Sequence, residues 1–390
     1  MAGVGTRSST NGDNNFACPK RAQVIGLDIL RLIAALSVVI YHYADQISVA
    51  GSDAHRFSLG VAAYPELAGF AQFGWMGVPA FFVISGFVIS FSASAATPGA
   101  FVGARILRLA PAVWICAPIS AICIILSGQN GVMSVLGRLF NSMTFFPLGS
   151  QIDGVYWTLS IEVSFYFTVF VLLALGRFSL FSRYIYVIAT VSAGYNVMLS
   201  LGFDQVHVFG KWSKLLLVDH GCEFALGAIA YRMHSDGIKA HRLLFFVVAL
   251  VGTFAQTTPL LQGFDLSVQT IIWAVFLLVF LATVAANTRL LSTTTSASRR
   301  VVREIGKATY PLYLIHQVVG AYIIYLLITL GLHRYGALIV ALLIVFLLTA
   351  GVTRLEPMLR ERIRPLVARL SERPRAVKAP DVAAPEAVSA

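Results

Sequence analysis

Charged residues are scarce in this chain of 390 residues. Asp, Glu, Lys and Arg together make up 12% of the sequence, hydrophobic residues make up 57%, and the mean hydropathy is +0.78. A soluble globular domain has roughly 25% charged residues. The composition therefore excludes an ordinary soluble protein and predicts an integral membrane protein.

Cysteine is also scarce, and its spacing matches no known motif. Cys18, Cys116, Cys123 and Cys222 are scattered, without a Cys-x-x-Cys pair or a metal-ligand spacing to histidine. This pattern indicates neither a disulfide framework nor a zinc site. We therefore expect no metal cofactor.

Acidic residues are outnumbered by basic ones. The chain has 18 Asp and Glu against 29 Lys and Arg, which gives a formal net charge of +11. In a soluble protein such an excess would suggest nucleic-acid binding, but in a membrane protein it usually reflects orientation in the bilayer. We therefore expect the lipid bilayer, and no nucleic acid, as the partner of these charges.

Ten apolar stretches are long enough to cross a bilayer as helices, which takes about 20 residues each. They cover residues 27–47, 73–93, 109–126, 155–175, 184–203, 215–231, 243–261, 266–285, 310–330 and 335–353. The predicted fold is an all-α polytopic membrane protein with about ten transmembrane helices. Residues 24–353 form its transmembrane domain, residues 1–23 a polar N-terminal segment, and residues 354–390 a basic, then Pro- and Ala-rich tail that we expect to be disordered.

The basic residues fall mainly on one side of this arrangement. Of the 29 Lys and Arg residues, 23 lie in the connections and terminal segments of one side and five on the other. The positive-inside rule assigns the richer side to the cytoplasm. We therefore expect a multi-pass protein of the cell membrane with both termini in the cytoplasm.

Ionisable residues within the apolar stretches are costly in lipid, so they are candidates for function. Arg31 and His42 in the first stretch are eleven residues apart. At 100° and 1.5 Å per residue they share one helix face, about 16 Å apart along the axis. An alternative is that Arg31 reaches to lipid phosphate and His42 bonds a neighbouring helix.

Glu162 is the carboxylate of the fourth stretch. It lies about seven residues from the outer end of that stretch, and His42 lies about five from the outer end of its own. The two side chains therefore have similar depths. A carboxylate beside an imidazole fixes its tautomer and stabilises the imidazolium, as a general-base histidine requires. The alternative is a buried carboxylic acid bonded to a helix backbone.

Arg105 and Arg108 stand at the cytoplasmic mouth of the third stretch, three residues apart. This spacing places two guanidinium groups on one helix face, where they could clamp a phosphate or pyrophosphate. Ordinary anchoring at the membrane surface is the alternative.

Two further groups are candidates for the acceptor side of a reaction. Asp219 and Glu223 share a helix face in the sixth stretch, with His220 beside them, and could line an acceptor cavity or serve polar packing. His316 lies about six residues inside the ninth stretch, where a packing role is the alternative.

Six short motifs occur in order across residues 25–350. They are Gly26-Leu27-Asp28 with Arg31 and His42 at an Arg-x10-His spacing, Gly77 to Gly86 with Ser85, Arg105-x-x-Arg108 with Pro111, Trp157-Thr158-Leu159-Ser160-Ile161-Glu162, Phe224-Ala225-Leu226-Gly227, and Tyr310-Pro311-Leu312-Tyr313-Leu314-Ile315-His316. In this order and spacing they make the chain resemble the membrane-bound acyltransferase 3 family.

The resemblance implies transfer of an acyl group, expected to be acetyl, from cytoplasmic acyl-coenzyme A to a hydroxyl of a carbohydrate or other small acceptor. It carries the family's catalytic base over to His42 and the family's arginines to Arg31, Arg105 and Arg108, with donor phosphates as their ligands. We expect no extracytoplasmic hydrolase-like domain of the kind that some relatives carry.

A multispan transporter or flippase for a glycan precursor is the alternative function. It would use His42 and Glu162 as a proton relay. Against it, no pair of Gly/Pro-interrupted stretches repeats between the halves of the chain, and a pump does not need a basic clamp at its mouth.

Overall fold

The computed structural model describes residues 25–203, 210–257 and 266–371. All regular secondary structure in these ranges is helical. The prediction of an all-α protein is therefore confirmed.

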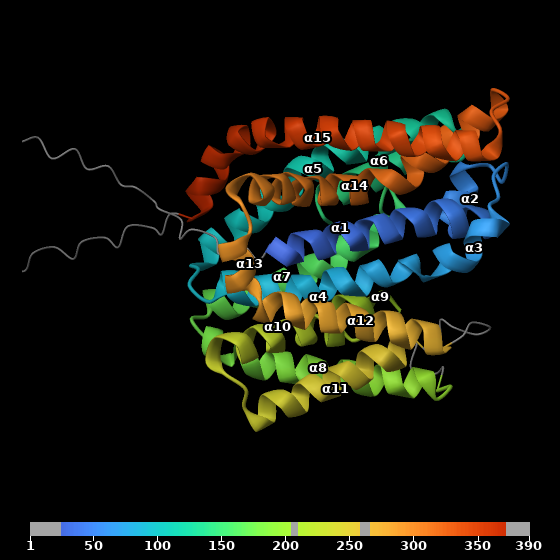
Figure 1. Ribbon diagram of the computed structural model, residues 1–390. Helices are drawn as coiled ribbons and strands as arrows, with labels where there is room; N and C mark the ends of the chain where they lie inside the picture. The colour runs from blue at the N-terminus through green and yellow to red at the C-terminus, as the bar shows by residue number, and fades with distance from the viewer. Residues whose placement is uncertain (1–24, 204–209, 258–265, 372–390) are drawn as a thin grey trace, which may run out of the picture.

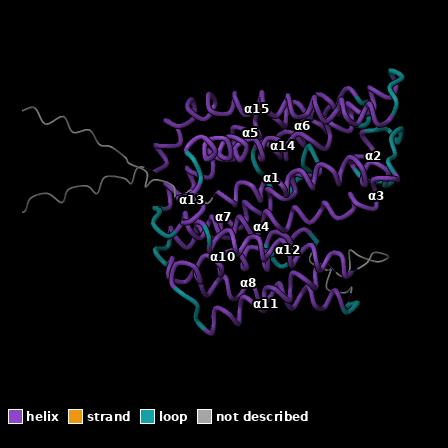
Figure 2. The backbone as a smooth tube through the Cα atoms, viewed as in Figure 1, coloured by secondary structure: helices purple, strands orange, loops and turns teal. Residues whose placement is uncertain are grey.

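The helices pack side by side as one bundle (Figures 1 and 2). Each of the ten predicted stretches coincides with a long helix of the described chain. These helices are α1 (Ile25–Ile40), α4 (Gly77–Ala93), α5 (Pro98–Leu126), α7 (Trp157–Ala174), α8 (Phe181–Ser200), α10 (Gly221–Asp236), α11 (Ala240–Thr257), α12 (Leu266–Ala285), α14 (Ser296–Thr329) and α15 (Arg334–Ser371). By length and composition, seven of the described helical segments could cross a membrane, and a shorter apolar helix covers Ala240–Gln256. The polytopic class is therefore confirmed, while α8, α10 and α11 complete the bundle beside these seven.

Short helical segments connect the long ones. They are the α-helices α2 (Asp53–Phe57), α3 (Pro65–Ala71), α6 (Val132–Met143), α9 (Lys211–Leu215) and α13 (Asn287–Thr293), a π-helical turn over Tyr41–Asp45, and 3₁₀ turns over Gln46–Ser48, Gln72–Met76, Gly154–Tyr156 and Phe178–Leu180. The amphipathic helix α6 lies in a connection that the sequence analysis did not assign to a helix.

The described chain begins and ends at the same end of the bundle. In Figure 1, α1 starts and α15 finishes on the left, while α2 and α3 lie on the right. We call the left end the terminal end and the right end the distal end. This arrangement agrees with termini on one side of the membrane, and the assignment of that side to the cytoplasm stays a prediction.

Several helices continue beyond the apolar stretches. Thr97 caps α5, which begins before the predicted stretch, and Thr295 caps α14 in the same way, each accepting a hydrogen bond from a backbone N–H three residues later. At the other end of the chain, α15 extends to Ser371, so the expectation of a disordered tail from residue 354 is wrong as far as residue 371. Hydropathy locates the part of a helix in lipid, while capping and propensity decide where the helix itself ends. Residues 372–390 lie outside the described residues.

Glycines bring α4 and α10 into close contact. A methyl group added to Gly86 would overlap the carbonyl oxygen of Phe224, and one added to Gly227 would overlap the carbonyl oxygen of Val83. Small residues allow such close approach of helix backbones in lipid, where van der Waals packing holds helices together. The contact joins α4, which lines the site described below, to the second half of the bundle.

The buried apolar residues form two clusters. One is built mainly from α4, α7, α8, α10 and α12, and the other mainly from α5, α14, α15 and the second half of α1. Val78, Phe81 and Tyr310 pack against both clusters. The candidate site lies at this junction, because the same three residues line its cavity.

Candidate active site

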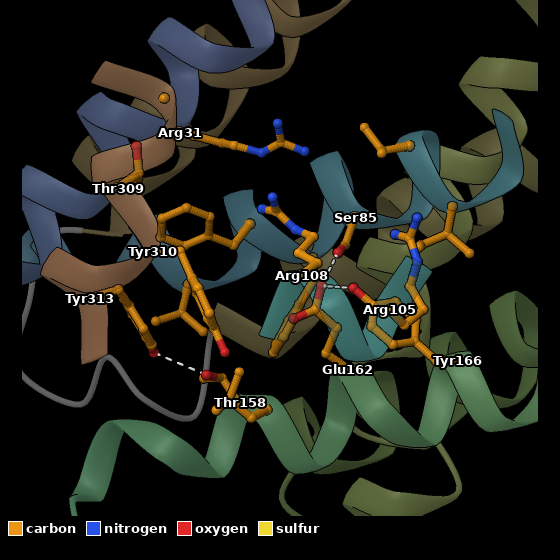
Figure 3. A pocket seen from close by; sticks show the side chains of 17 residues that line it. Arg31, Ser85, Arg105, Arg108, Thr158, Glu162, Tyr166, Thr309, Tyr310 and Tyr313 are labelled. Atoms are coloured by element: carbon orange, nitrogen blue, oxygen red, sulfur yellow. Dashed lines mark hydrogen bonds between the residues drawn. The ribbon is translucent and has the colours of Figure 1, made fainter. Parts of the chain in front are cut away.

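A cavity opens between α1, α4, α5, α7 and α14, with an empty volume of about 760 Å³ that includes open solvent. Figure 3 shows its lining from close by. Its polar side chains are Arg31, Ser85, Arg105, Arg108, Thr158, Glu162, Tyr166, Thr309, Tyr310 and Tyr313. The structure therefore brings the three arginines singled out in the sequence into one cavity.

Arg105 is held in place by aromatic rings. Its guanidinium carbon lies 5.5 Å from the ring centroid of Phe101 and 5.5 Å from that of Tyr166. Arginine stacks well on such rings because its guanidinium is planar and weakly hydrated. The residue is 8% exposed, and its buried Nε has no hydrogen-bond partner. This fixed cation thus keeps a donor group available for an anion.

The other two arginines complete a basic lining. Arg31 pairs with Asp28, with 3.2 Å between Nη1 and Oδ1, and Arg108 is exposed where the cavity opens. Because Arg31 lines a protein cavity, the structure favours this interpretation over an arginine that reaches to lipid. The lining thus holds three guanidinium groups and one carboxylate, and Asp28 is a second carboxylate beside Arg31. Such a lining suits an anion.

The predicted pairing of Glu162 with His42 is wrong. Glu162 Oε1 accepts hydrogen bonds from Ser85 Oγ, at 2.5 Å, and from the hydroxyl of Tyr166 (Figure 3). These donors are side chains, so the alternative of a carboxyl bonded to the helix backbone is not seen either. The prediction compared only depths, and two groups at the same depth meet only if their helices also turn the right faces to each other.

His42 is paired instead with His316. It lies in the π-helical turn Tyr41–Asp45 that follows α1, and π turns often occur at functional sites. Its Nδ1 lies 3.1 Å from His316 Nε2 and 2.9 Å from the carbonyl oxygen of Val38. His316, on α14, is fully buried. The predicted base and a residue predicted for the acceptor side thus form one unit.

The histidine pair lies next to the inner wall of the cavity. Tyr313 lines the cavity, and its ring centroid is 5.8 Å from that of His316. Phe81 lines it too, with its ring 5.6 Å from that of Tyr313. His42 itself is partly exposed.

Asp219 and Glu223 do not line the cavity. Asp219 Oδ2 accepts a hydrogen bond from Ser213 Oγ at 3.0 Å, and the fully buried Glu223 has its Oε1 3.6 Å from His220 Nδ1. The ring of His220 lies 5.2 Å from that of Phe82, which lines the cavity. Glu223 is thus separated from the cavity by His220 and Phe82. His316 does not line the cavity either and is bonded to His42.

Sequence reasoning assigned no role to the hydroxyl groups of the cavity, although Ser85, Thr158, Tyr310 and Tyr313 stand in the motifs. Tyr166 follows Glu162 by four residues, so helical spacing could have paired them. Ser85 comes from another helix, and Thr158 Oγ1 meets the Tyr313 hydroxyl at 3.2 Å across two helices, so no local signal marks these contacts. Within the described ranges, no group of three or more His, Cys, Asp or Glu side chains is placed to hold a metal ion.

The described residues thus form a helical membrane bundle with a basic cavity beside two hydrogen-bonded histidines. A family model described as an acyltransferase domain matches residues 24–353. The chain therefore belongs to the membrane-bound acyltransferase 3 family and is a membrane acyltransferase. A search of curated proteins and a search of solved structures gave no match.

Proposed function

We propose that the protein transfers an acyl group, expected to be acetyl, from acyl-coenzyme A to a hydroxyl of a carbohydrate or another small acceptor. The observation that carries this proposal is the convergence of Arg31, Arg105 and Arg108 in a cavity whose lining residue Tyr313 contacts His316, the partner of His42. A pyrophosphate needs convergent cations, and an alcohol nucleophile needs a base. The three arginines would supply the cations, and His42 would supply the base.

The donor would enter from the terminal end, which the charge pattern predicts to be cytoplasmic, in a protein of the cell membrane. Its phosphates would meet the three guanidinium groups, because guanidinium forks bind phosphate oxygens in pairs. The apolar end of the cavity, with Phe81 and Tyr313, would receive the thioester end. Glu162, bonded to Ser85, would hold the cavity wall and limit the excess of positive charge.

His42 would act as general base at the far end. The acceptor hydroxyl gives its proton to a ring nitrogen of His42, and its oxygen bonds to the acyl carbon. The carbon–sulfur bond of the thioester then breaks, and the thiolate of coenzyme A takes the proton back from the imidazolium. A positioned general base of this kind contributes about 10²- to 10⁴-fold in rate.

Transfer from radiolabelled acetyl-coenzyme A to a panel of sugars and small alcohols tests the proposal on the purified protein. His42→Ala should abolish transfer while still binding the donor, and Arg105→Ala and Arg108→Ala should lose donor binding. His241→Ala on α11 and Arg354→Ala on α15 are matched controls, because both residues are exposed and do not line the cavity.

Two results would reject parts of this assignment. Full transfer by His42→Ala would reject His42 as the base. Equal donor binding by all variants would reject the arginines as a phosphate clamp. The transporter alternative is not proposed, because His42 and Glu162 have separate hydrogen-bond partners and form no direct relay.

A further inference from the structure

His316 has a hydrogen-bond environment that fixes its own tautomer. Its Nδ1 lies 2.9 Å from the carbonyl oxygen of Tyr313 and 3.2 Å from that of Leu312. A carbonyl oxygen only accepts hydrogen bonds, so Nδ1 must carry the ring proton. In the neutral ring, Nε2 is then left with a lone pair, and this nitrogen faces His42.

The same reasoning fixes the tautomer of His42. Its Nδ1 lies between two acceptors, the lone pair of His316 Nε2 at 3.1 Å and the carbonyl oxygen of Val38 at 2.9 Å. Two acceptors on one nitrogen require the proton there. The other ring nitrogen of neutral His42, Nε2, consequently has its lone pair, which is the form that a base needs.

The π turn that carries His42 is held at a fixed distance from α14. The hydroxyl of Tyr43, in the same π turn as His42, donates a hydrogen bond to the carbonyl oxygen of His316 at 2.7 Å. Gly320, one turn further along α14, has no side chain, and a methyl group there would overlap the Tyr43 hydroxyl. The contact therefore sets the separation of the π turn and α14 that the two rings require.

We propose that His316 is the positioning residue of the acyl transfer, which orients His42 and accepts a hydrogen bond from its Nδ1–H when His42 becomes an imidazolium. Many catalytic histidines have a carboxylate in this position. A neutral imidazole does the same without placing a second charge in a buried, apolar setting, where a lone charge is costly. This inference rests on the proposed function, because it assigns a partner to the proposed base.

Two substitutions separate this role from simple packing. His316→Leu fills similar space but offers no acceptor, and should lower kcat about 10- to 100-fold, because a hydrogen bond to a charged group is lost. His316→Gln can place its amide oxygen near the position of the lost Nε2, so kcat should return to within about fivefold of the wild type. The donor Kd should be unchanged in both variants, and His241→Leu is the matched control on α11.

Nitrogen NMR of the wild-type protein with ¹⁵N-labelled histidine provides the second measurement. His42, identified by the signals missing from His42→Ala, should show a protonated Nδ1, an unprotonated Nε2, and a coupling across the hydrogen bond to His316 Nε2. This readout needs no variant at residue 316 to fold, and a protonated Nε2 on neutral His42 would overturn the inference.

The kinetic outcomes are equally decisive. Wild-type kcat in His316→Leu, or equal losses in His316→Leu and His316→Gln, would overturn the positioning role. Transfer that survives His42→Ala would instead reject His42 as the base and, with it, the role of His316. Absence of transfer by the wild-type protein would reject the proposed function itself. Transfer that is lost in His42→Ala but kept in His316→Leu would reject only the role of His316.

Discussion

Alanine at Gly227 should destabilise the protein, because this glycine lies where α10 crosses α4. The added methyl carbon would overlap the carbonyl oxygen of Val83 and lie 2.7 Å from the backbone nitrogen of Phe87. Both neighbours are backbone atoms, so no side chain can rotate away and the helices must separate. Such overpacking typically costs about 1–3 kcal/mol.

Gly194 in α8 is the matched control, since a methyl group there would have no atom within 4 Å. Replacing either helical glycine by alanine favours the helix by about 0.8–1 kcal/mol. This contribution cancels when the two variants are compared. The free energy of unfolding of Gly194→Ala should therefore exceed that of Gly227→Ala by about 1–3 kcal/mol, the packing cost alone.

The assay is thermal or chemical unfolding of both variants in one detergent at one protein concentration. The expected order of stability places Gly194→Ala at or above the wild type and Gly227→Ala below Gly194→Ala. Equal stabilities, or the reverse order, would refute the close helix crossing. Gly86→Ala changes the same crossing, so its effect should not add to that of Gly227→Ala.

Three more predictions concern single polar side chains. Arg105→Lys should weaken donor binding about tenfold more than Arg108→Lys, because only the former loses a stacked planar cation; equal losses in a calorimetric titration would contradict this. Ser85→Ala should lower the free energy of unfolding by about 1–3 kcal/mol by removing a donor to the partly buried carboxylate of Glu162, and an unchanged unfolding midpoint would count against that hydrogen bond. Asp153 accepts hydrogen bonds from two backbone N–H groups, one through each carboxylate oxygen. Asp153→Asn leaves one acceptor and should lower the free energy of unfolding by about 1–3 kcal/mol, measured from the unfolding midpoint.

Periodicity within one helix predicted part of the site. Arg105 and Arg108 are neighbours on one helix face, so the backbone alone brings them together, and both line the cavity. Arg31 lines it too, whereas His42 lies beyond the end of α1 in a π turn and is not among the lining residues. The apolar stretches were predictable for a similar reason, because the bilayer sets their minimum length.

Contacts between helices were not predictable in this way. Glu162 was expected to meet His42, but its carboxylate is bonded to Ser85 on α4 and to Tyr166 on its own helix. His316 was singled out as ionisable in lipid, yet nothing in its own stretch identifies the first helix as its partner. The choice of partner depends on the packing of the whole bundle.

The fixed spacing of Arg31 and His42 sets a minimum length for the donor molecule. If Arg31 binds donor phosphate, the acyl carbon must reach about 16 Å further along the axis to meet the base. Coenzyme A can bridge that gap because a long pantetheine arm separates its pyrophosphate from its sulfur. Acetyl phosphate, whose acyl carbon is bonded directly to a phosphate oxygen, cannot bridge it, so an activated acyl group alone would not make a molecule a substrate.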